Sequence, residues 1–160
     1  MVGLIVGVVE MKEIKFYKLK DPYGFMGNFY SSKIDIYGKT WENVEAPYQS
    51  QKTLVQDEID QIHSSKSARE ARNLGQKVIM RSDWDDIKAI AMYECVFAKF
   101  DQNLELAKEL FETGDAYLIE DSPVDSYWGC GADGLGKNML GKILMRVRQL
   151  YKEKNYVTIG

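Results

Sequence analysis

The chain has 160 residues, a length that is typical of one domain and short for two. Hydrophobic residues make up 45% and charged residues 28%, which is typical of a globular protein. The net charge of -3 excludes a broad basic surface for non-specific binding to duplex nucleic acid. A single histidine excludes multi-histidine metal motifs. The two cysteines form neither a CxxC pair nor a disulfide framework, which favours a reducing cytoplasm.

The first residues of the chain, 1–9, are mostly apolar. They lack the basic start of a signal peptide and are too short to span a bilayer. We therefore expect an extension or edge strand over residues 1–13 and one domain over residues 14–160, with no membrane contact.

Alternating apolar and polar residues predict the strands of the domain. One short strand is expected at 14–17, and a second at 33–37 leads through Gly38 into a hairpin. A further strand is expected at 116–119. The aromatic segment 25–30 is too apolar for an idle surface loop, and we interpret it as the wall of a pocket.

Capping signals predict where the helices begin and end. Pro47 is tolerated only in or near a first turn, so a helix is expected from about residue 43 onward. Capping boxes are predicted at Ser67 and at Ser82, and Gly75 is expected to end the first of these helices. The later helices are expected over residues 67–75, 82–100, 103–113 and 138–151.

The apolar spacing of the two middle helices predicts which side chains face the core. Lys99 and Phe100, in contrast, are expected to cover the surface. The side chains expected to face inward are Ile87, Ile90, Ala91, Phe97, Leu106, Leu110 and Phe111.

A carboxylate, an amide and an ammonium group recur at helical spacing near residue 50. Glu45, Gln49 and Lys52 are four and three residues apart, which places them on one face of a helix, with Tyr48 on the same side. An exposed polar face with an ion pair is the simpler interpretation of this spacing. A pocket in which these groups converge is the functional one.

The segment 131–138 nearly matches the phosphate-binding pattern GxxxxGK[ST], with Asn138 in place of the Ser or Thr. It lies too near the end of the chain for the later strand that such a fold needs, so we interpret the match as chance. The run still leads into a helix and offers backbone N–H groups to a phosphate. It closes a long loop, 121–136, of a length that is usually functional.

A series of short motifs follows one another between residue 14 and about residue 150. In order they are Phe29 after Gly27-Asn28, Glu45 to Lys52, Arg81 with Trp84, Lys99-Phe100, Thr113-Gly114, Leu118 with Glu120, Asp125 with Trp128-Gly129 and Gly131, and Gly136, Asn138, Leu140 and Gly141. Each motif is weak alone, whereas the ordered set is fairly specific. Together they resemble the YbiA-like (NADAR) family.

The resemblance implies a fold and an activity. The fold is a mostly helical α+β domain with a small β-sheet. The activity is that of an N-glycosidase without a cofactor or metal, which cleaves a ribose C1′–N bond in ribosylated intermediates of riboflavin synthesis or in ADP-ribosylated guanine. The partner is then a phosphorylated ribosyl or ADP-ribosyl substrate, with ADP-ribosylated nucleic acid as one form of it.

The reaction builds positive charge on the ribose, so a carboxylate is needed near C1′. Glu45 is our first candidate and Asp125 the second, which binds ribose hydroxyls or shares the acid-base work. Lys52, Arg81 and the glycine-rich run are the candidates to neutralise phosphate or diphosphate. Alternatively, Lys52 attacks an opened sugar as a nucleophile. The substrate-binding candidates are Asn28, Phe29, Tyr48, Gln49, Arg81, Trp84, Trp128, Gly129, Gly131 and Asn138.

The chain departs from the family pattern directly after the motif glutamate. The family commonly has a histidine there, whereas this chain has Ala46 followed by Pro47. The substitution leaves two hypotheses open. Either the enzyme has a different substrate preference, or the domain is a non-catalytic module that binds ADP-ribose or a related nucleotide.

Overall fold

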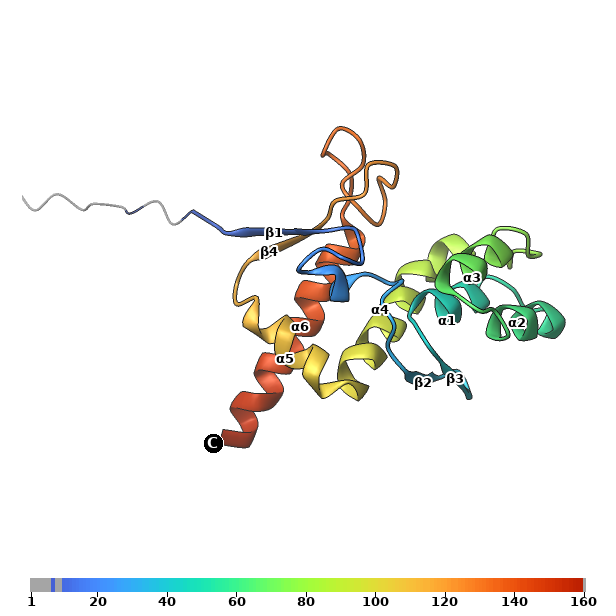
Figure 1. Ribbon diagram of the computed structural model, residues 1–160, viewed down its shortest axis with the longest axis horizontal. Helices are drawn as coiled ribbons and strands as arrows, with labels where there is room; N and C mark the ends of the chain where they lie inside the picture. The colour runs from blue at the N-terminus through green and yellow to red at the C-terminus, as the bar shows by residue number, and fades with distance from the viewer. Residues whose placement is uncertain (1–6, 8–9, 160) are drawn as a thin grey trace, which may run out of the picture.

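The structure is a computed structural model that describes residue 7 and residues 10–159, with side chains described up to Asn155. Six α-helices and two small sheets make up this part of the chain, with β1 and β4 along one side and the hairpin of β2 and β3 at an edge (Figure 1). The α+β class expected from the sequence is confirmed. In chain order the elements are β1 (Glu13–Phe16), the 3₁₀ turn η1 (Gly24–Met26), β2 (Ile34–Ile36), β3 (Lys39–Trp41), α1 (Glu45–Ser50), α2 (Gln56–His63), α3 (Ala68–Gly75), α4 (Trp84–Gln102), α5 (Leu104–Glu112), β4 (Tyr117–Glu120) and α6 (Met139–Ile159).

The expected N-terminal extension over residues 1–13 lies mostly outside the described residues, and β1 begins at its end. Two separate pairs of strands lie within residues 10–159. β1 pairs in parallel with β4, with Ile14 opposite Leu118. β2 and β3 form the expected hairpin, which turns through Tyr37 and Gly38 at φ values of 54° and 72°. Positive φ at both central residues is the geometry that matches the twist of a hairpin.

Helix α6 lies directly against β4, as its position in Figure 1 shows. A side chain at Gly141 would place its Cβ 2.1 Å from the Leu118 carbonyl oxygen, so only glycine allows this approach. Asn138, at φ 51°, fastens the start of the helix to the same strand. Its amide donates to the Leu118 carbonyl at 2.8 Å, and its Oδ1 accepts the Glu120 N–H at 2.9 Å.

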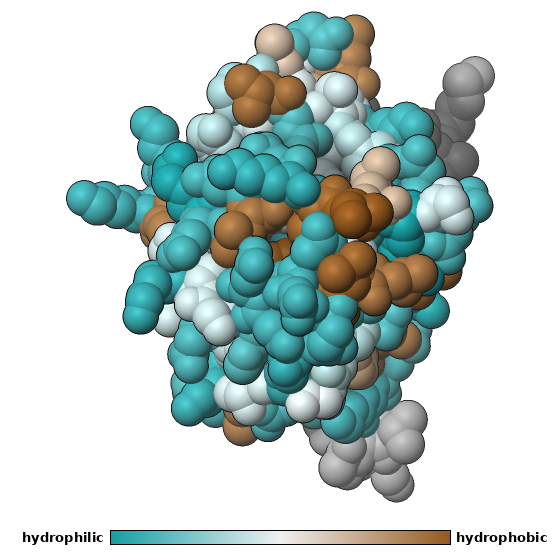
Figure 2. All heavy atoms as spheres, turned by 90° about the vertical axis from the view of Figure 1, so that its right-hand side faces the viewer, coloured by the Kyte–Doolittle hydropathy of each residue, from teal (hydrophilic) through white to brown (hydrophobic). Residues whose placement is uncertain are grey.

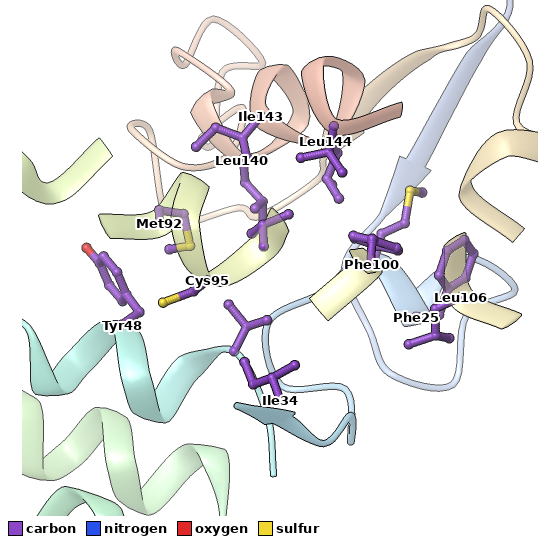
Figure 3. Close-up of a cluster of buried hydrophobic side chains, with 14 of the residues drawn as sticks. Phe25, Ile34, Tyr48, Met92, Cys95, Phe100, Leu106, Leu140, Ile143 and Leu144 are labelled. Carbon is purple, nitrogen blue, oxygen red and sulfur yellow. The ribbon is translucent and has the colours of Figure 1, made fainter. Parts of the chain in front are cut away.

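The core lies between β1, α1, α4 and α6. Tyr48 from α1, Met92 and Cys95 from α4 and Leu140 from α6 converge in it with Ile34 of the hairpin (Figure 3). No helix within residues 10–159 combines the length and the apolar character that a membrane crossing needs.

The expected core face of α4 was wrong at two positions. Ile90 and Phe97 are 59% and 39% exposed, Ile87 is half-buried, and only Ala91 is buried as expected. Helix α4 carries apolar residues on two adjacent stripes, and periodicity alone does not select between them. The buried residues of the helix are Trp84, Ala91, Met92, Cys95, Val96, Ala98, Lys99 and Phe100.

The expectation for helix α5 and for the capping boxes held in part. Leu106 and Leu110 are buried, but Phe111 is 43% exposed.

The Ser67 hydroxyl accepts the Glu70 N–H at 3.1 Å, which confirms the first box. The second box was wrong, because α4 begins at Trp84 after Asp83.

Lys99 contradicts its expected place on the surface, since it is 1% exposed on the buried face of α4. Its ammonium donates to the carbonyl oxygens of Phe25 and Gly27, the second at 3.0 Å. Burial lowers the pKa of Lys99 to about 7. These two hydrogen bonds from buried Lys99 therefore fix the backbone of the aromatic segment before Asn28.

Figure 2 views the molecule from the side of α2 and α3. Hydrophilic side chains cover most of this face, and apolar ones gather near its middle. Exposed apolar residues in the segments on either side of α2 and α3 are Leu54, Val55, Ile79 and Met80.

We predict that Gly141→Ala destabilises the protein by about 2–3 kcal/mol, because the added methyl group forces α6 away from β4. Urea unfolding measures the change. Lys142→Ala, at the next and exposed position, is the matched control and should stay within about 0.5 kcal/mol of wild type. Equal stability of the two variants would contradict the close contact.

Candidate active site

Glu45 is the first residue of α1 and is only 6% exposed. The Gln49 amide donates to its Oε1 at 2.7 Å, so the four-residue spacing does bring these side chains together. Burial raises the pKa of Glu45, whereas the Gln49 hydrogen bond and the charges of Arg72 and Lys52 act in the opposite direction. An exposed ion pair, the simpler interpretation of the sequence, is therefore wrong.

The local sequence explains why a helix starts at this point. The Asn43 side chain accepts the Ala46 N–H at 2.9 Å and supplies a cap. Pro47 lies in the first turn, where a missing N–H costs nothing. The Glu45 N–H donates to the Asn28 carbonyl at 3.2 Å, which joins the helix to the segment that Lys99 holds.

Asn28 lies next to the start of α1, and Phe29 follows it in the chain. The Asn28 amide contacts the Met92 sulfur at 3.4 Å, and its Oδ1 is buried without a hydrogen-bond partner among the described residues. Phe29 is half-buried beside it. An unpartnered buried amide oxygen leaves a position for a donor from a bound molecule.

Aromatic rings form one wall of the site. The Tyr48 ring lies between Trp84, at 5.3 Å, and Trp128, at 5.5 Å in an edge-to-face arrangement. Trp84 is 5% exposed and packs in the core, whereas Trp128 is half-buried. Burial, followed by the Glu45 charge, raises the pKa of Tyr48. Trp128 is thus the more exposed of the two tryptophans, and the Tyr127 ring also contacts it edge-to-face at 4.7 Å.

The loop after β4 places Asp125 beside this wall. Its Oδ1 accepts the N–H groups of Tyr127 at 2.9 Å and of Trp128 at 2.7 Å. A Cβ at Gly129 would lie 2.8 Å from the Glu120 carbonyl oxygen, so the loop can fold this tightly only with glycine there. The Asp125 charge contributes to the raised pKa of Glu45, after burial as the largest cause.

Glu120 is a third carboxyl of the site, and we did not select it as a site residue from the sequence. Side chains alternate along a strand, so Glu120 shares the face of fully buried Leu118. Its backbone is fixed by Asn138 and by the Cys130 N–H, which donates to its carbonyl at 2.9 Å. Its Oε2 is buried without a hydrogen-bond partner among the described residues. The signal available in the sequence was a glutamate two positions after a core leucine.

The electrostatics of Glu120 join it to the same cluster. Burial raises its pKa to about 7, the charges of Asp125 and Glu45 act in the same direction, and Arg72 opposes them. The described residues contain no group of acidic, histidine or cysteine side chains arranged to hold a metal ion.

Two cations act electrostatically on these carboxyls, Arg72 on Glu45 and Glu120 and Lys52 on Glu45. Lys52 is half-buried, and burial lowers its pKa while the Glu45 charge opposes that shift. Arg72 of α3 acts electrostatically on Glu45, Lys52 and Glu120, although nothing in the sequence near it pointed to a site.

Other expected site residues are committed to contacts within the protein. The Arg81 guanidinium donates to the Asp83 carboxylate at 2.6 and 3.0 Å. Asn138 uses both ends of its amide on β4, and the Gly131 N–H, at φ 69°, donates to the Asp125 carbonyl. A cavity of about 510 Å³ lies elsewhere, between α4, α5 and α6, and none of the expected site residues lines it.

We predict that Glu120→Gln removes a pH dependence of stability. Between pH 4.5 and about 7 the unfolded chain ionises this carboxyl while the folded protein keeps its proton, so wild-type stability falls as pH rises through that window. The variant should gain up to about 3 kcal/mol relative to wild type between pH 4 and pH 8.

Urea unfolding of both proteins at the two pH values measures this difference. Glu112→Gln, at an exposed position, is the control. A wild-type-to-variant difference that stays the same at both pH values would show that Glu120 holds no proton in the fold.

The fold and the site define an α+β domain with a buried carboxylate centre, and comparisons with known proteins place it in a family. The sequence model of the NADAR domain matches residues 15–151. The chain belongs to the NADAR domain family, as its motifs indicated.

Relatives match over most of their length. A Nostoc punctiforme protein named N-glycosidase is 42% identical over 141 residues, which is 85% of this chain and 90% of that protein. The Escherichia coli protein N-glycosidase YbiA is 37% identical over 138 residues, with 85% and 86% covered. The NMR structure of E. coli YbiA superposes with a TM-score of 0.83 at 37% identity and covers 94% of this chain and 92% of that one.

The domain also occurs within longer proteins. A Vibrio vulnificus protein named as a riboflavin biosynthesis protein is 39% identical over 142 residues, which span 88% of this chain but 39% of that protein.

Proposed function

We propose that this chain hydrolyses the C1′–N bond between a ribose phosphate or ADP-ribose unit and a nitrogenous base. The observation that carries the proposal is the buried Glu45 carboxyl, which lies near Asp125 and Glu120 beside an aromatic wall. Its relatives support the class of reaction, since two of them are named N-glycosidases. The chain is an enzyme of this class, a hydrolase of N-glycosyl bonds.

We assign to Glu45 the stabilisation of the ribosyl cation or the orientation of the attacking water. Departure of the base builds positive charge on C1′ and its ring oxygen, and a carboxylate in a water-poor site stabilises that charge strongly. The Gln49 amide holds the Glu45 carboxylate in one orientation. In that position it either faces the cationic sugar or orients the attacking water, while Asp125 binds ribose hydroxyls.

We assign to Glu120 the protonation of the leaving nitrogenous base. The leaving nitrogen needs a proton, and a donor is most effective when its pKa lies near the working pH. The pKa of Glu120, raised by burial to about 7, meets that condition, and its buried Oε2 has no partner within the described part of the fold. Trp128 then stacks on the base, because an aromatic face accepts any planar ring.

The acidic balance of the chain favours a small phosphorylated ribosyl metabolite over ADP-ribosylated nucleic acid. The name of the Vibrio vulnificus relative supports an intermediate of riboflavin synthesis. Ala46, in place of the usual family histidine, is the position where substrate preference would differ. We place the reaction in the cytoplasm, where the free thiols of Cys95 and Cys130 stay reduced.

We predict that Glu45→Gln lowers turnover by roughly 100-fold or more, because it removes the negative charge while keeping the shape. Binding of ADP-ribose should stay within a few-fold of wild type. Steady-state kinetics and calorimetric titration measure the two quantities.

Glu42→Gln, three residues away and exposed, is the matched control and should turn over at the wild-type rate. Hydrolysis is supported if Glu45→Gln loses turnover but still binds ADP-ribose, while Glu42→Gln keeps its turnover. A wild-type protein that binds ADP-ribose but releases no base would instead favour a binding module.

We predict that kcat/KM of the wild type falls as pH rises through about 7, because Glu120 loses the proton that it donates. Glu120→Gln should be slower at pH 6 and should lack this fall. A pH profile of kcat/KM for both proteins tests the assignment. An unchanged fall in the variant would assign the proton to another group.

A further inference from the structure

The sequence offered three groups for binding a phosphate: Lys52, Arg81 and the glycine-rich run before α6. The Arg81 guanidinium is already held by both oxygens of the Asp83 carboxylate. Consecutive N–H groups of the run, from Gly134 to Leu140, all donate to acceptors within residues 126–133. Of the three, only the Lys52 ammonium is therefore still available to bind a phosphate.

Arg72 supplies a second cation at the same place. Ala68, Arg72 and Gly75 are spaced by four and three residues, so they share one stripe of α3. Gly75 packs against α1 so closely that a Cβ there would lie 2.0 Å from the Gln49 Oε1. Arg72 therefore lies on the edge of α3 that faces the residues holding Glu45.

The Arg72 side chain is exposed, and among the described residues it has no hydrogen bond and no ion pair within 4 Å. α3 lies on an outer side of the molecule (Figure 1), and the exposed Arg72 side chain is accessible to a ligand from solvent. A guanidinium presents a planar fork of donors that matches two oxygens of a phosphate.

The charge of Arg72 also acts unfavourably on Lys52, because two like charges near one another are repelled. A bound anion between them would remove that repulsion. The same two cations act on the Glu45 carboxyl, so an anion held by them lies next to the proposed reaction centre.

We propose that Arg72 and Lys52 form the phosphate subsite of this enzyme, which holds the phosphate ester of the ribosyl substrate while Glu45 faces its C1′. The inference rests on the proposed function, because it uses the same site. It transfers to Arg72 the role that the sequence suggested for Arg81 and for the glycine-rich run. A 5′-monophosphate and the diphosphate of ADP-ribose share this chemistry.

The test is calorimetric titration of wild type, Arg72→Ala and Arg69→Ala with ribose 5-phosphate, ADP-ribose and unphosphorylated ribose. Arg69 is the matched control, an exposed arginine three residues earlier on the same helix. Arg72→Ala should weaken binding of ribose 5-phosphate by roughly 10-fold or more, as loss of a charge-assisted hydrogen bond does. Arg69→Ala should stay within twofold, and ribose binding should be the same in all three proteins.

The two phosphorylated ligands distinguish the substrate class. A loss confined to ribose 5-phosphate assigns the subsite to a monophosphate, and a loss confined to ADP-ribose assigns it to a diphosphate. Equal affinities of Arg72→Ala and wild type for both ligands would overturn the proposal.

Kinetics separate this proposal from the proposed function. With a ribosylamine 5′-phosphate, Arg72→Ala should raise KM by roughly 10-fold and leave kcat within a few-fold, while Arg69→Ala changes neither. Phosphate binding that depends on Arg72 in a wild type without turnover would support the subsite and contradict the hydrolase. Turnover with an unchanged KM in Arg72→Ala would contradict the subsite and leave the hydrolase intact.

Discussion

The site depends on the burial of one carboxyl, that of Glu45, on a helix of only six residues. A helix this short does not hold together alone, so its packing against α2, α3 and α4 maintains it. All six of its residues are buried, and the Gln49 amide is the hydrogen-bond partner that keeps the carboxyl in one orientation. Gly75 allows α3 to approach closely enough to enclose that pair.

Burial of Glu45 also explains the electrostatic character of the surroundings. Burial raises the pKa of Glu45 and of Glu120, and the charge of Asp125 adds to both shifts. The charge of Arg72 opposes both pKa shifts, and the charge of Lys52 opposes that of Glu45. A charge arrangement of this kind is costly to stability, and such costs concentrate at functional sites. It is suited to an activity in which a carboxyl exchanges a proton near neutral pH, as the pKa of Glu120 at about 7 allows.

The sequence was sufficient for the parts of the site that are local. The spacing of Glu45 and Gln49 predicted a shared helical face, and the hydrogen bond between them confirms it. The family motifs also indicated the α+β fold and the family. Glu120 was not selected, because its place depends on parallel pairing of β4 with β1, about a hundred residues away in the chain. No local periodicity encodes a pairing of that range.

Charged residues account for the other differences between sequence and structure. Lys99 belongs to a residue type that is almost never fully buried, yet it holds two carbonyl oxygens beneath the aromatic segment. Arg81 and Arg72 are chemically identical in the sequence, and only the structure shows that the first is paired with Asp83. The glycine-rich run resembles a phosphate loop, but its N–H groups close the loop on itself.

The activity itself is tested most directly by incubating the purified wild-type protein with two substrates in parallel. One is a ribosylamine 5′-phosphate of a pyrimidine, and the other is an oligonucleotide that carries ADP-ribosylated guanine. Product analysis by mass spectrometry should show free base with ribose 5-phosphate from the first, and any ADP-ribose released from the second identifies a broader substrate range. Release of neither product, with ADP-ribose still bound, would contradict N-glycosidase activity.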